Sequence, residues 1–392
     1  MSEPSSYAPF GQCGRVPVRP PLRLAICSAG EIWGGVEQCI ATLSQGLKTM
    51  NVQLVVILFH DGLLARKMRT LNLEVELLDG YAKYDPRAIG QLRRVLHHHR
   101  IDVVHLHGYK ATIVGGLAAL GTRVAVVKTE HGRVEPLAAW RALRGYCRLH
   151  INNVLDRVIS RFLTDAVVFV SQDIERTAGS RTARLERRMI YNGIEPVGGS
   201  AQDAPARWRS DGEFHIGIVG RIDKVKGHSQ LIRALTRLDH LRGLRLHVFG
   251  AGPLENECRR LCHEAGVTER VCFHGFQEAI HMHMMSLDLL VMPSLHEGLP
   301  FALLEAMYLK VPVIASSVGG LREVIEDDQS GVLVPPGDEG ALAAAIERQY
   351  WNPELRLRLA ENAYRRVIRD FLAPEMVRRY AELYEQLLSR SR

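Results

Sequence analysis

The chain repeats one pattern twice: short apolar runs alternate with amphipathic segments, and a polar stretch interrupts the alternation once. The first run, LRLAICS at 22–28, is too short for a helix and predicts a buried strand. An amphipathic segment, GVEQCIATLSQGLKTM, follows it at 35–50. Such alternation is typical of parallel sheets with helices on both faces. We therefore predict an α/β fold of two Rossmann-like, doubly wound domains that face each other across a cleft.

The interruption, PVGGSAQDAPARWRSDG at 196–212, predicts a linker because Gly, Pro, Ser and Asp favour loops. The alternation restarts with FHIGIVGR at 214–221. A chain of 392 residues fits two domains of roughly 150–200 residues each. The predicted parts are a disordered tail at 1–20, a first domain at 21–196, a linker at 197–212, a second domain at 213–371 and a C-terminal helix at 372–392 that packs back on the first domain.

Composition places the chain among globular proteins of the cytoplasm. It is 46% hydrophobic and 24% charged, and no run reaches the ~20 apolar residues of a membrane-spanning helix. The N-terminal segment lacks the apolar core of a signal peptide. The seven cysteines show no disulfide framework. Cys258 and Cys262 are four apart, but no second pair completes a metal site, so we expect buried thiols in a reducing compartment.

The net charge of +7 is unevenly distributed. Residues 1–200 carry 26 Lys and Arg against 17 Asp and Glu, whereas residues 201–392 carry 24 against 26. This asymmetry fits an anionic partner of the first half, and drift in surface composition fits it equally well.

The segment VGRIDKVKGH places two cations directly after a predicted strand. Gly220 ends the strand, and Arg221 and Lys226 follow five residues apart. A guanidinium fork and an ammonium suit a diphosphate, although two solvated cations on a loop are the simpler interpretation of this segment alone.

The segment SLHEGLPFALLEAM at 294–307 places two carboxylates on either side of a helix start. Glu297 lies in the loop after the strand DLLVM, and Pro300 fits the first turn of a helix that carries Glu305. The free N–H groups of a helix N-terminus bind phosphate. Taken singly, the two acids could instead be solvated surface charges.

Glycines and histidines end several other predicted strands. In the second domain these are FGAGP at 249–253 and FHGF at 273–276, where a glycine permits close approach of a ligand or simply forms a turn. In the first domain Gly34 and Gly35 follow the first strand, HLHG ends the strand at 101–107, and His131 ends another. Because carboxyl ends of parallel strands share one edge of a sheet, these motifs belong together.

Together these segments resemble glycosyltransferase family 4, the retaining nucleotide-sugar transferases of GT-B fold. The resemblance covers about residues 22–350. Its most specific motif is the Glu-x7-Glu of HEGLPFALLEAM with Gly-Leu-Pro inside. The other motifs are Gly-Gly-Val-Glu at 34–37, Thr-Glu-His at 129–131, YNGI at 191–194, GRIDKVKG, GAGP and FHGF.

The resemblance implies a hexosyltransferase whose first domain takes the acceptor and whose second domain takes the nucleotide sugar. Arg221 and Lys226 would hold the diphosphate, Glu305 the ribose hydroxyls and Glu297 the hydroxyls of the donor sugar. The residues that it makes catalytic are Arg221, Lys226, Glu297 and His131. Those that it places at the donor are Gly34, Gly35, Gly220, Gly250, Gly252, Gly275, Phe276, Gly298, Phe301, Ala302, Leu303 and Glu305.

Fixed cations and a helix N-terminus can stabilise a departing diphosphate without a metal. The chain contains no Asp-x-Asp, and we expect neither metal nor cofactor beyond the donor substrate. By resemblance the acceptor attacks from the face that the phosphate leaves, and a covalent intermediate on Glu297 is the alternative.

The acceptor is expected to be a saccharide or a lipid-linked saccharide, in the synthesis of a cell-surface polysaccharide or glycolipid. Arg141, Arg144 and Arg148 are spaced to share one helix face, which would suit an anionic membrane surface or would simply be solvated. The protein is thus expected in the cytoplasm, with possible peripheral attachment to the membrane.

Three other functions were weighed. A dehydrogenase would need a G-x-G-x-x-G motif, which SAGEIWGG does not match. A nucleic-acid-binding protein is suggested by charge alone, and we expect no nucleic-acid partner. A non-catalytic nucleotide-sugar-binding protein of the same fold stays open as the alternative, and a turnover assay would separate it from an enzyme.

Overall fold

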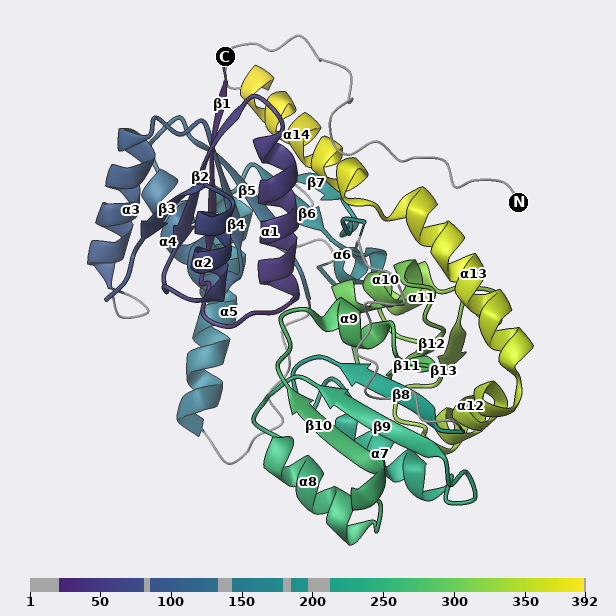
Figure 1. Ribbon diagram of the computed structural model, residues 1–392. Coiled ribbons are helices and arrows are strands. Elements are labelled where there is room, and N and C mark those ends of the chain that lie inside the picture. Colours follow the sequence, from purple (N-terminus) through teal and green to yellow (C-terminus); the bar gives the residue numbers. More distant parts are fainter. Residues whose placement is uncertain (1–20, 81–84, 133–142, 179–184, 197–211, 391–392) are drawn as a thin grey trace, which may run out of the picture. The chain divides into compact units, whose positions relative to one another are not determined.

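The computed structural model describes residues 21–80, 85–132, 143–178, 185–196 and 212–390, which form two compact units (Figure 1). Unit 1 contains the chain up to Val170, Ile174–Gly193 and the C-terminal segment from Ala373. Unit 2 contains Ser171–Asp173 and Ile194–Leu372. The predicted tail at 1–20 lies outside the described residues, as does the predicted linker apart from Gly212.

Unit 1 is built on a seven-stranded parallel sheet in the order β3-β2-β1-β4-β5-β6-β7. Its strands are β1 (Leu22–Ser28), β2 (Val52–Leu58), β3 (Glu74–Leu77), β4 (Val103–His107), β5 (Ala125–Glu130), β6 (Ala166–Phe169) and β7 (Glu186–Met189). The helices between them are α1 (Gly35–Lys48), α2 (Leu63–Thr70), α3 (Pro86–His98), α4 (Tyr109–Ala119), α5 (Leu143–Leu163) and α6 (Gln172–Ala178).

A buried core joins one face of this sheet to α3 and α4. It includes Cys27 and Leu106 from the strands, and Leu92 and Val114 from the helices. The C-terminal helix α14 (Ala373–Arg390) packs along α1 (Figure 1). Gly46 permits this approach, since a Cβ there would lie only 2.4 Å from Val377 Cγ2. A segment at the end of the chain therefore completes the first unit.

Unit 2 has a six-stranded parallel sheet in the order β10-β9-β8-β11-β12-β13. Its strands are β8 (Phe214–Val219), β9 (Leu244–Phe249), β10 (Val271–Gly275), β11 (Leu289–Met292), β12 (Val313–Ser316) and β13 (Val332–Val334). Its helices are α7 (His228–Thr236), α8 (Glu255–Glu264), α9 (Ile280–Met284), α10 (Phe301–Tyr308), α11 (Leu321–Val324), α12 (Glu339–Trp351) and α13 (Pro353–Asp370).

The strand order reverses once in each sheet, beside the strand that comes first in its unit. In unit 1 the reversal lies between β1 and β4, and in unit 2 between β8 and β11. Open parallel sheets bind ligands at the carboxyl ends of the strands at this switch point. The fold thus points to the loops after β1, β4, β8 and β11.

The predicted class of two Rossmann-like domains is confirmed. The helices α2 and α12 were not predicted, and neither were two shorter elements. The edge strand β7 has the sequence ERRM, and charged residues there hide its period while protecting the edge from pairing with another chain. The five-residue helix α9 is too short to show a helical period. Cys258 and Cys262 are free and buried, as predicted.

Candidate active site

The switch point of unit 2 joins two loops through an ion pair. Lys226, which precedes α7, places Nζ 2.7 Å from Oε1 of Glu297 in the loop after β11. The same oxygen accepts a hydrogen bond from Oγ of Ser294 at 2.8 Å. The Glu297 side chain is only 8% exposed, so this carboxylate is held almost without water. Lys226 also passes over Gly220, because a Cβ there would lie 3.5 Å from its Cε.

Arg221 begins the same loop and is much more open. Its side chain is 55% exposed, and Nε donates to Oδ2 of Asp223 at 2.8 Å. The other Asp223 oxygen accepts from the backbone N–H groups of Val225 and Lys226, at 3.0 and 3.1 Å. Asp223 therefore shapes the loop that carries both predicted phosphate ligands.

Glycines allow the strand ends of unit 2 to pack backbone against backbone. A Cβ at Gly250 would lie 1.9 Å from the carbonyl oxygen of Gly220, and Gly250 N–H donates to the Gly275 carbonyl at 2.8 Å. A Cβ at Gly252 would lie 2.3 Å from the carbonyl oxygen of Ile222. The ends of β8, β9 and β10 are thus brought together as the sequence predicted.

A second backbone contact supports Glu297. Gly319, in the loop after β12, has φ +46°, and a Cβ there would lie 1.9 Å from the Glu297 carbonyl oxygen. Its neighbour Gly320 donates its N–H to the carbonyl of Gly298 at 2.8 Å. The loop after β12 therefore supports the backbone of the Glu297 loop.

The helix α10 begins at Phe301, with Pro300 as its N-cap. The N–H of Leu303 donates to the Pro300 carbonyl, whereas those of Phe301 and Ala302 have no partner among the described residues. The side chains of Phe301 and Leu303 lie in the core. These residues therefore meet a ligand only through their backbone.

Glu305 lies one turn further along α10, on the same side as the half-buried Ala302. Its carboxylate makes no hydrogen bond or ion pair with any residue that the structure describes. Burial raises the pKa of Glu305 to about 7. A partly buried carboxylate without a donor is costly, which indicates a site that awaits donor groups from a ligand.

Phe276, directly after β10, has a ring that is 44% exposed. The described contacts do not join it to Lys226 or Glu297. It is the one aromatic side chain in this group of predicted residues that is free to flank a planar ligand.

The loop after β1 leads into α1 through Gly34 and Gly35. Gly34 is the N-cap, and its N–H donates to the carboxylate of Glu37 in the first turn. Burial raises the pKa of Glu37, and hydrogen bonds from its own N–H and that of Gly34 oppose this shift. Glu37 thus supplies the N3 half of a capping box, which holds the Gly34 backbone in place.

His131 follows β5 and pairs with a histidine of the neighbouring strand. Its Nε2 lies 2.8 Å from Nδ1 of His107, at the end of β4, and the two rings stack. Burial lowers the pKa of His131 to about 4. The imidazole is therefore neutral at pH 7.

No role was predicted for several residues of these sites, although all but Gly319 lie inside motifs quoted above. Asp223, Ser294, Gly319, Glu37 and His107 act through neighbours that were identified. The segment SVGG at 317–320, a Gly pair directly after a strand, is a signal that could have revealed Gly319. Ser294 three residues before Glu297 is a weaker one.

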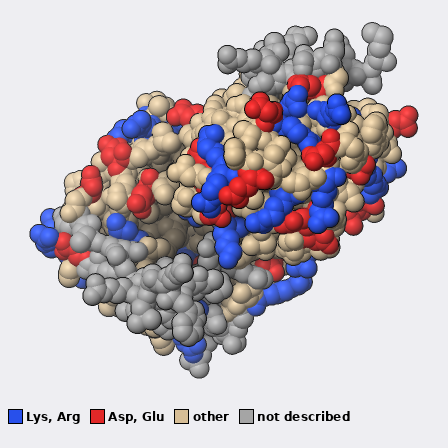
Figure 2. Space-filling view, turned by 90° about the horizontal axis from the view of Figure 1, so that it is seen from below, with Lys and Arg blue, Asp and Glu red and all other residues tan. Residues whose placement is uncertain are grey.

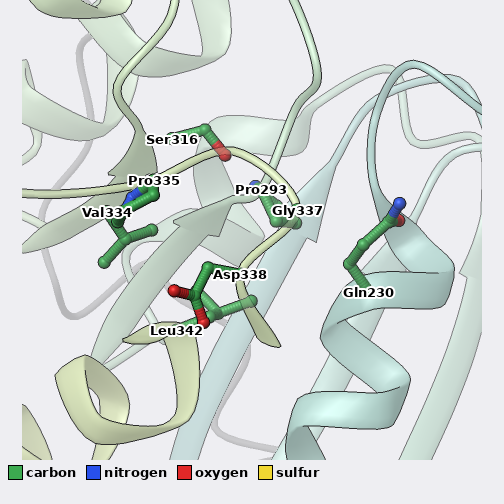
Figure 3. Close-up of a pocket in the computed structure, with 8 residues that line it drawn as sticks. All are labelled: Gln230, Pro293, Ser316, Val334, Pro335, Gly337, Asp338 and Leu342. Atoms are coloured by element: carbon green, nitrogen blue, oxygen red, sulfur yellow. The ribbon is translucent and has the colours of Figure 1, made fainter. Parts of the chain in front are cut away.

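Two other features lie apart from these motifs. A shallow depression near the ends of β12 and β13, lined by Ser316, Val334 and Asp338 among others, has no enclosed space large enough for a water molecule (Figure 3). Glu74, Glu76 and His99 are the one group of three possible metal ligands among the described residues. Nε2 of His99 is hydrogen-bonded to Glu76 at 3.0 Å and Nδ1 lies 3.8 Å from Glu74, at the β3 edge of the sheet, so neither feature adds to the site.

Two family models match the chain. Residues 33–197 match "Glycosyltransferase Family 4", and residues 202–366 match "Glycosyl transferases group 1". The two matches begin after β1, end within α13, and include all the motifs described above.

Named relatives extend over most of the chain. It is 30% identical over 312 residues to 2-deoxystreptamine glucosyltransferase of Streptomyces kanamyceticus, which covers 74% of this chain and 78% of that protein. It is 38% identical over 266 residues to 2-deoxystreptamine N-acetyl-D-glucosaminyltransferase of Streptomyces fradiae, covering 63% and 62%.

Solved structures share the fold. HepE of Anabaena in complex with UDP and glucose superimposes with a TM-score of 0.81 at 21% identity, covering 93% of this chain and 99% of that one. Sucrose-phosphate synthase of Thermosynechococcus elongatus gives a TM-score of 0.77 at 21% identity, covering 94% and 100%.

Proposed function

Because this chain belongs to the glycosyl transferases of group 1 and is a glycosyltransferase, we propose that it moves a hexose from a nucleoside-diphosphate sugar to a hydroxyl of a saccharide or lipid-linked saccharide, with retention of configuration. The donor class is inferred mainly from the polar groups arranged along α10. Within the described residues, the carboxylate of Glu305 has no partner, and it follows two N–H groups, those of Phe301 and Ala302, that are likewise unpaired there.

The donor's four parts find matching chemistry in unit 2. The diphosphate takes Arg221, Lys226 and the N-terminus of α10, which offer positive charge and free N–H groups. The ribose hydroxyls donate to Glu305, and the sugar hydroxyls donate to the free oxygen of Glu297. The base lies at Gly275 and the exposed ring of Phe276.

Unit 1 contributes a loop and an imidazole. The family resemblance assigns the Gly34–Gly35 backbone, held by Glu37, to the diphosphate and His131 to the donor sugar. In HepE the bound molecules are UDP and glucose, which agrees with a nucleotide-sugar donor here.

The reaction breaks the bond between the anomeric carbon and the β-phosphate oxygen. Arg221, Lys226 and the helix N-terminus stabilise the charge that develops on that oxygen. The acceptor hydroxyl attacks from the same face, and a phosphate oxygen takes its proton. A covalent intermediate on Glu297 is less favoured, since Oε1 already accepts from Lys226 and Ser294.

These cations make a metal unnecessary for leaving-group stabilisation, and the chain has no Asp-x-Asp to hold one. We propose neither a cofactor nor a nucleic-acid partner. Basic and acidic side chains are interspersed over the described part of the face seen in Figure 2.

The acceptor is proposed to be lipid-linked because α5 carries an unusual surface. Val154, Val158 and Phe162 recur every four residues and are 41%, 46% and 70% exposed, beside exposed Arg157 and Arg161. Apolar and cationic side chains on one helix suit an anionic membrane surface. None of the helices in the described part of the chain is long and apolar enough to cross a bilayer.

The predicted arginines of the same helical stretch add nothing further. Arg141 and the side chains of Arg144 and Arg148 lie outside what the structure describes. The proposal for a peripheral enzyme of cell-surface polysaccharide or glycolipid synthesis therefore depends on the second half of α5.

The donor assignment is tested by thermal stabilisation with UDP-, GDP- and ADP-sugars. A ligand at about one hundred times its Kd stabilises the folded state by roughly 3 kcal/mol. One nucleotide class should raise the Tm of the wild type and not of Arg221→Ala. Arg259→Ala is the matched control, because Arg259 is 51% exposed and pairs with Glu255 at 2.8 Å, as Arg221 does with Asp223.

No Tm shift with any nucleotide sugar would refute the assigned site. Binding without release of nucleoside diphosphate across a panel of lipid-linked and soluble saccharides would instead favour the non-catalytic binding protein.

A further inference from the structure

The carboxyl ends of β4 and β5 carry a group of buried polar side chains on one face of the unit 1 sheet. His105 and His107 alternate along β4 with Leu106, which belongs to the apolar core of the opposite face. Thr129 lies on β5 two residues before His131. His105, His107 and Thr129 are at most 1% exposed, so each of their polar atoms needs a partner within the protein.

Half of this group is held by α14. The hydroxyl of Tyr384 lies 2.8 Å from Nδ1 of His105, whose Nε2 lies 2.7 Å from Oγ1 of Thr129. That oxygen lies 3.0 Å from the hydroxyl of Tyr380. Burial lowers the pKa of His105 to about 3, so its neutral ring has one donor and one acceptor, and both are used.

The other half is the pair His107 and His131. Nδ1 of His107 lies 2.8 Å from Nε2 of His131, and the ring centroids are 5.0 Å apart. Both rings are neutral, because burial holds both pKa values below the usual range. One proton therefore lies in this bond, carried either by His107 or by His131.

The ring nitrogens outside this hydrogen bond determine which of the two histidines carries the shared proton. Nε2 of His107 is buried and has no partner among the described residues. If His131 donated, His107 would be left with a buried N–H that bonds to nothing. If His107 donates through Nδ1–H, its Nε2 is only an unused acceptor, and unused buried acceptors are less rare than orphaned N–H groups.

We infer that His107 is a positioning residue that fixes His131 as the Nδ1–H tautomer, so that His131 meets the donor sugar only as a hydrogen-bond donor. The ring of His105, 4.1 Å from that of His107, limits the movement of this pair from behind. The meeting with the sugar rests on the function proposed above, whereas the tautomer does not.

This assignment restricts what His131 can do in the reaction. Its Nε2 is committed to His107 and its Nδ1 carries a proton, so neither nitrogen can accept the proton of the attacking hydroxyl. Nδ1–H suits a hydroxyl or ring oxygen of the sugar near the reacting carbon. The proton of the acceptor must then leave by another route, which agrees with its transfer to a phosphate oxygen.

The test is long-range ¹H–¹⁵N correlation NMR of protein labelled with ¹⁵N-histidine, recorded at pH 7.5. The His131 signals are identified by their loss in His131→Gln. We expect a protonated Nδ1 and a bare Nε2 in the wild type. A protonated Nε2 in the wild type would overturn the inference without any variant.

Two variants separate positioning from general packing. In His107→Leu the proton of His131 should move to Nε2, the nitrogen that neutral imidazole prefers to protonate, and kcat should fall about 10- to 100-fold with little change in KM. In Tyr384→Phe, which removes an equally buried hydrogen bond of the same group, the Nδ1–H tautomer should persist. Persistence of Nδ1–H in His107→Leu would contradict the inference.

The two proposals fail in different ways. A His131 tautomer as expected, together with unchanged turnover in His131→Gln, would refute the role of His131 at the donor and leave the tautomer standing. A protonated Nε2 on His131, together with reduced turnover in His131→Gln, would refute the tautomer alone.

Discussion

Nζ of Lys226 lies 2.7 Å from Oε1 of Glu297, and this contact joins two loops whose residues are 71 positions apart in the chain. The pair lies at the switch point of the unit 2 sheet, where a ligand is expected. In the absence of the donor, each of the two charges is stabilised by the other. Breaking the pair should therefore affect stability as well as turnover.

Lys226→Met should lower the free energy of unfolding by about 2–4 kcal/mol, because among the described residues it leaves the nearly buried Glu297 carboxylate with only Ser294 as a donor. Urea titration measures this change. The double variant Lys226→Met with Glu297→Leu should recover at least half of the loss, since no charge is then left unpaired. Additive losses in the double variant would show that the pair does not hold either charge.

Glu305→Gln should stabilise the folded protein at pH 8 and weaken its binding of the nucleotide donor. The folded-state pKa of about 7 lies above the unfolded value of 4.5, so the folded state binds the proton more tightly. The wild type therefore loses stability as pH rises from about 4.5 to 7. Gln removes this loss, and we expect a gain of about 1–3 kcal/mol at pH 8 and almost none at pH 4.

Nucleotide binding should instead favour the ionised form of Glu305. Ribose hydroxyls donate to the ionised carboxylate, so the affinity of wild type for nucleoside diphosphate should rise up to about tenfold per pH unit between pH 5 and 7. Calorimetric titration at several pH values checks this, with Glu305→Gln as the variant that should show a flat profile. A wild-type profile as flat as that of the variant would place the ribose elsewhere.

Gly319→Ala should displace the Glu297 loop. The new Cβ would lie 1.9 Å from the Glu297 carbonyl oxygen at a φ of +46°. Gly266→Ala is the matched control, because Gly266 has φ +70° and open space around its Cβ position. The control should cost about 1 kcal/mol of backbone strain, and Gly319→Ala about 3 kcal/mol or more together with most donor affinity. Equal losses of thermal stability in Gly319→Ala and Gly266→Ala would show that Gly319 does not closely contact the Glu297 carbonyl.

Phe162→Ser should reduce binding to vesicles that contain anionic phospholipid. The side chain is 70% exposed beside Arg161 on α5, and its removal takes about 2 kcal/mol of apolar burial from the docked state. Co-sedimentation with anionic and with neutral vesicles measures the effect. Leu357→Ser, on α13 and 73% exposed, is the control that should leave binding unchanged. Equal losses in both variants, or none in either, would remove α5 as the membrane-facing surface.

Much of the fold could be predicted because its signals are local. Apolar runs such as LRLAICS and DLLVM bury both faces of a parallel strand and stand out in any window. Pro300 marked the start of α10 to within one residue. The strand β7 could not be predicted in this way, because an edge strand such as ERRM needs no apolar period to pair with its neighbour.

The sequence by itself determined the two Rossmann-like domains, and the order of the motifs along the chain placed Arg221, Lys226, Glu297 and Glu305 at strand ends and a helix start. Parallel strands oblige such ends to share one edge of a sheet, so a local pattern was sufficient. Only the tertiary structure decided how these residues are held: the Lys226–Glu297 pair, the support by Gly319, and the contact between α14 and the histidines of β4. Those contacts join residues 22 to 279 positions apart, and no periodicity records which distant side chains burial brings to hydrogen-bond distance.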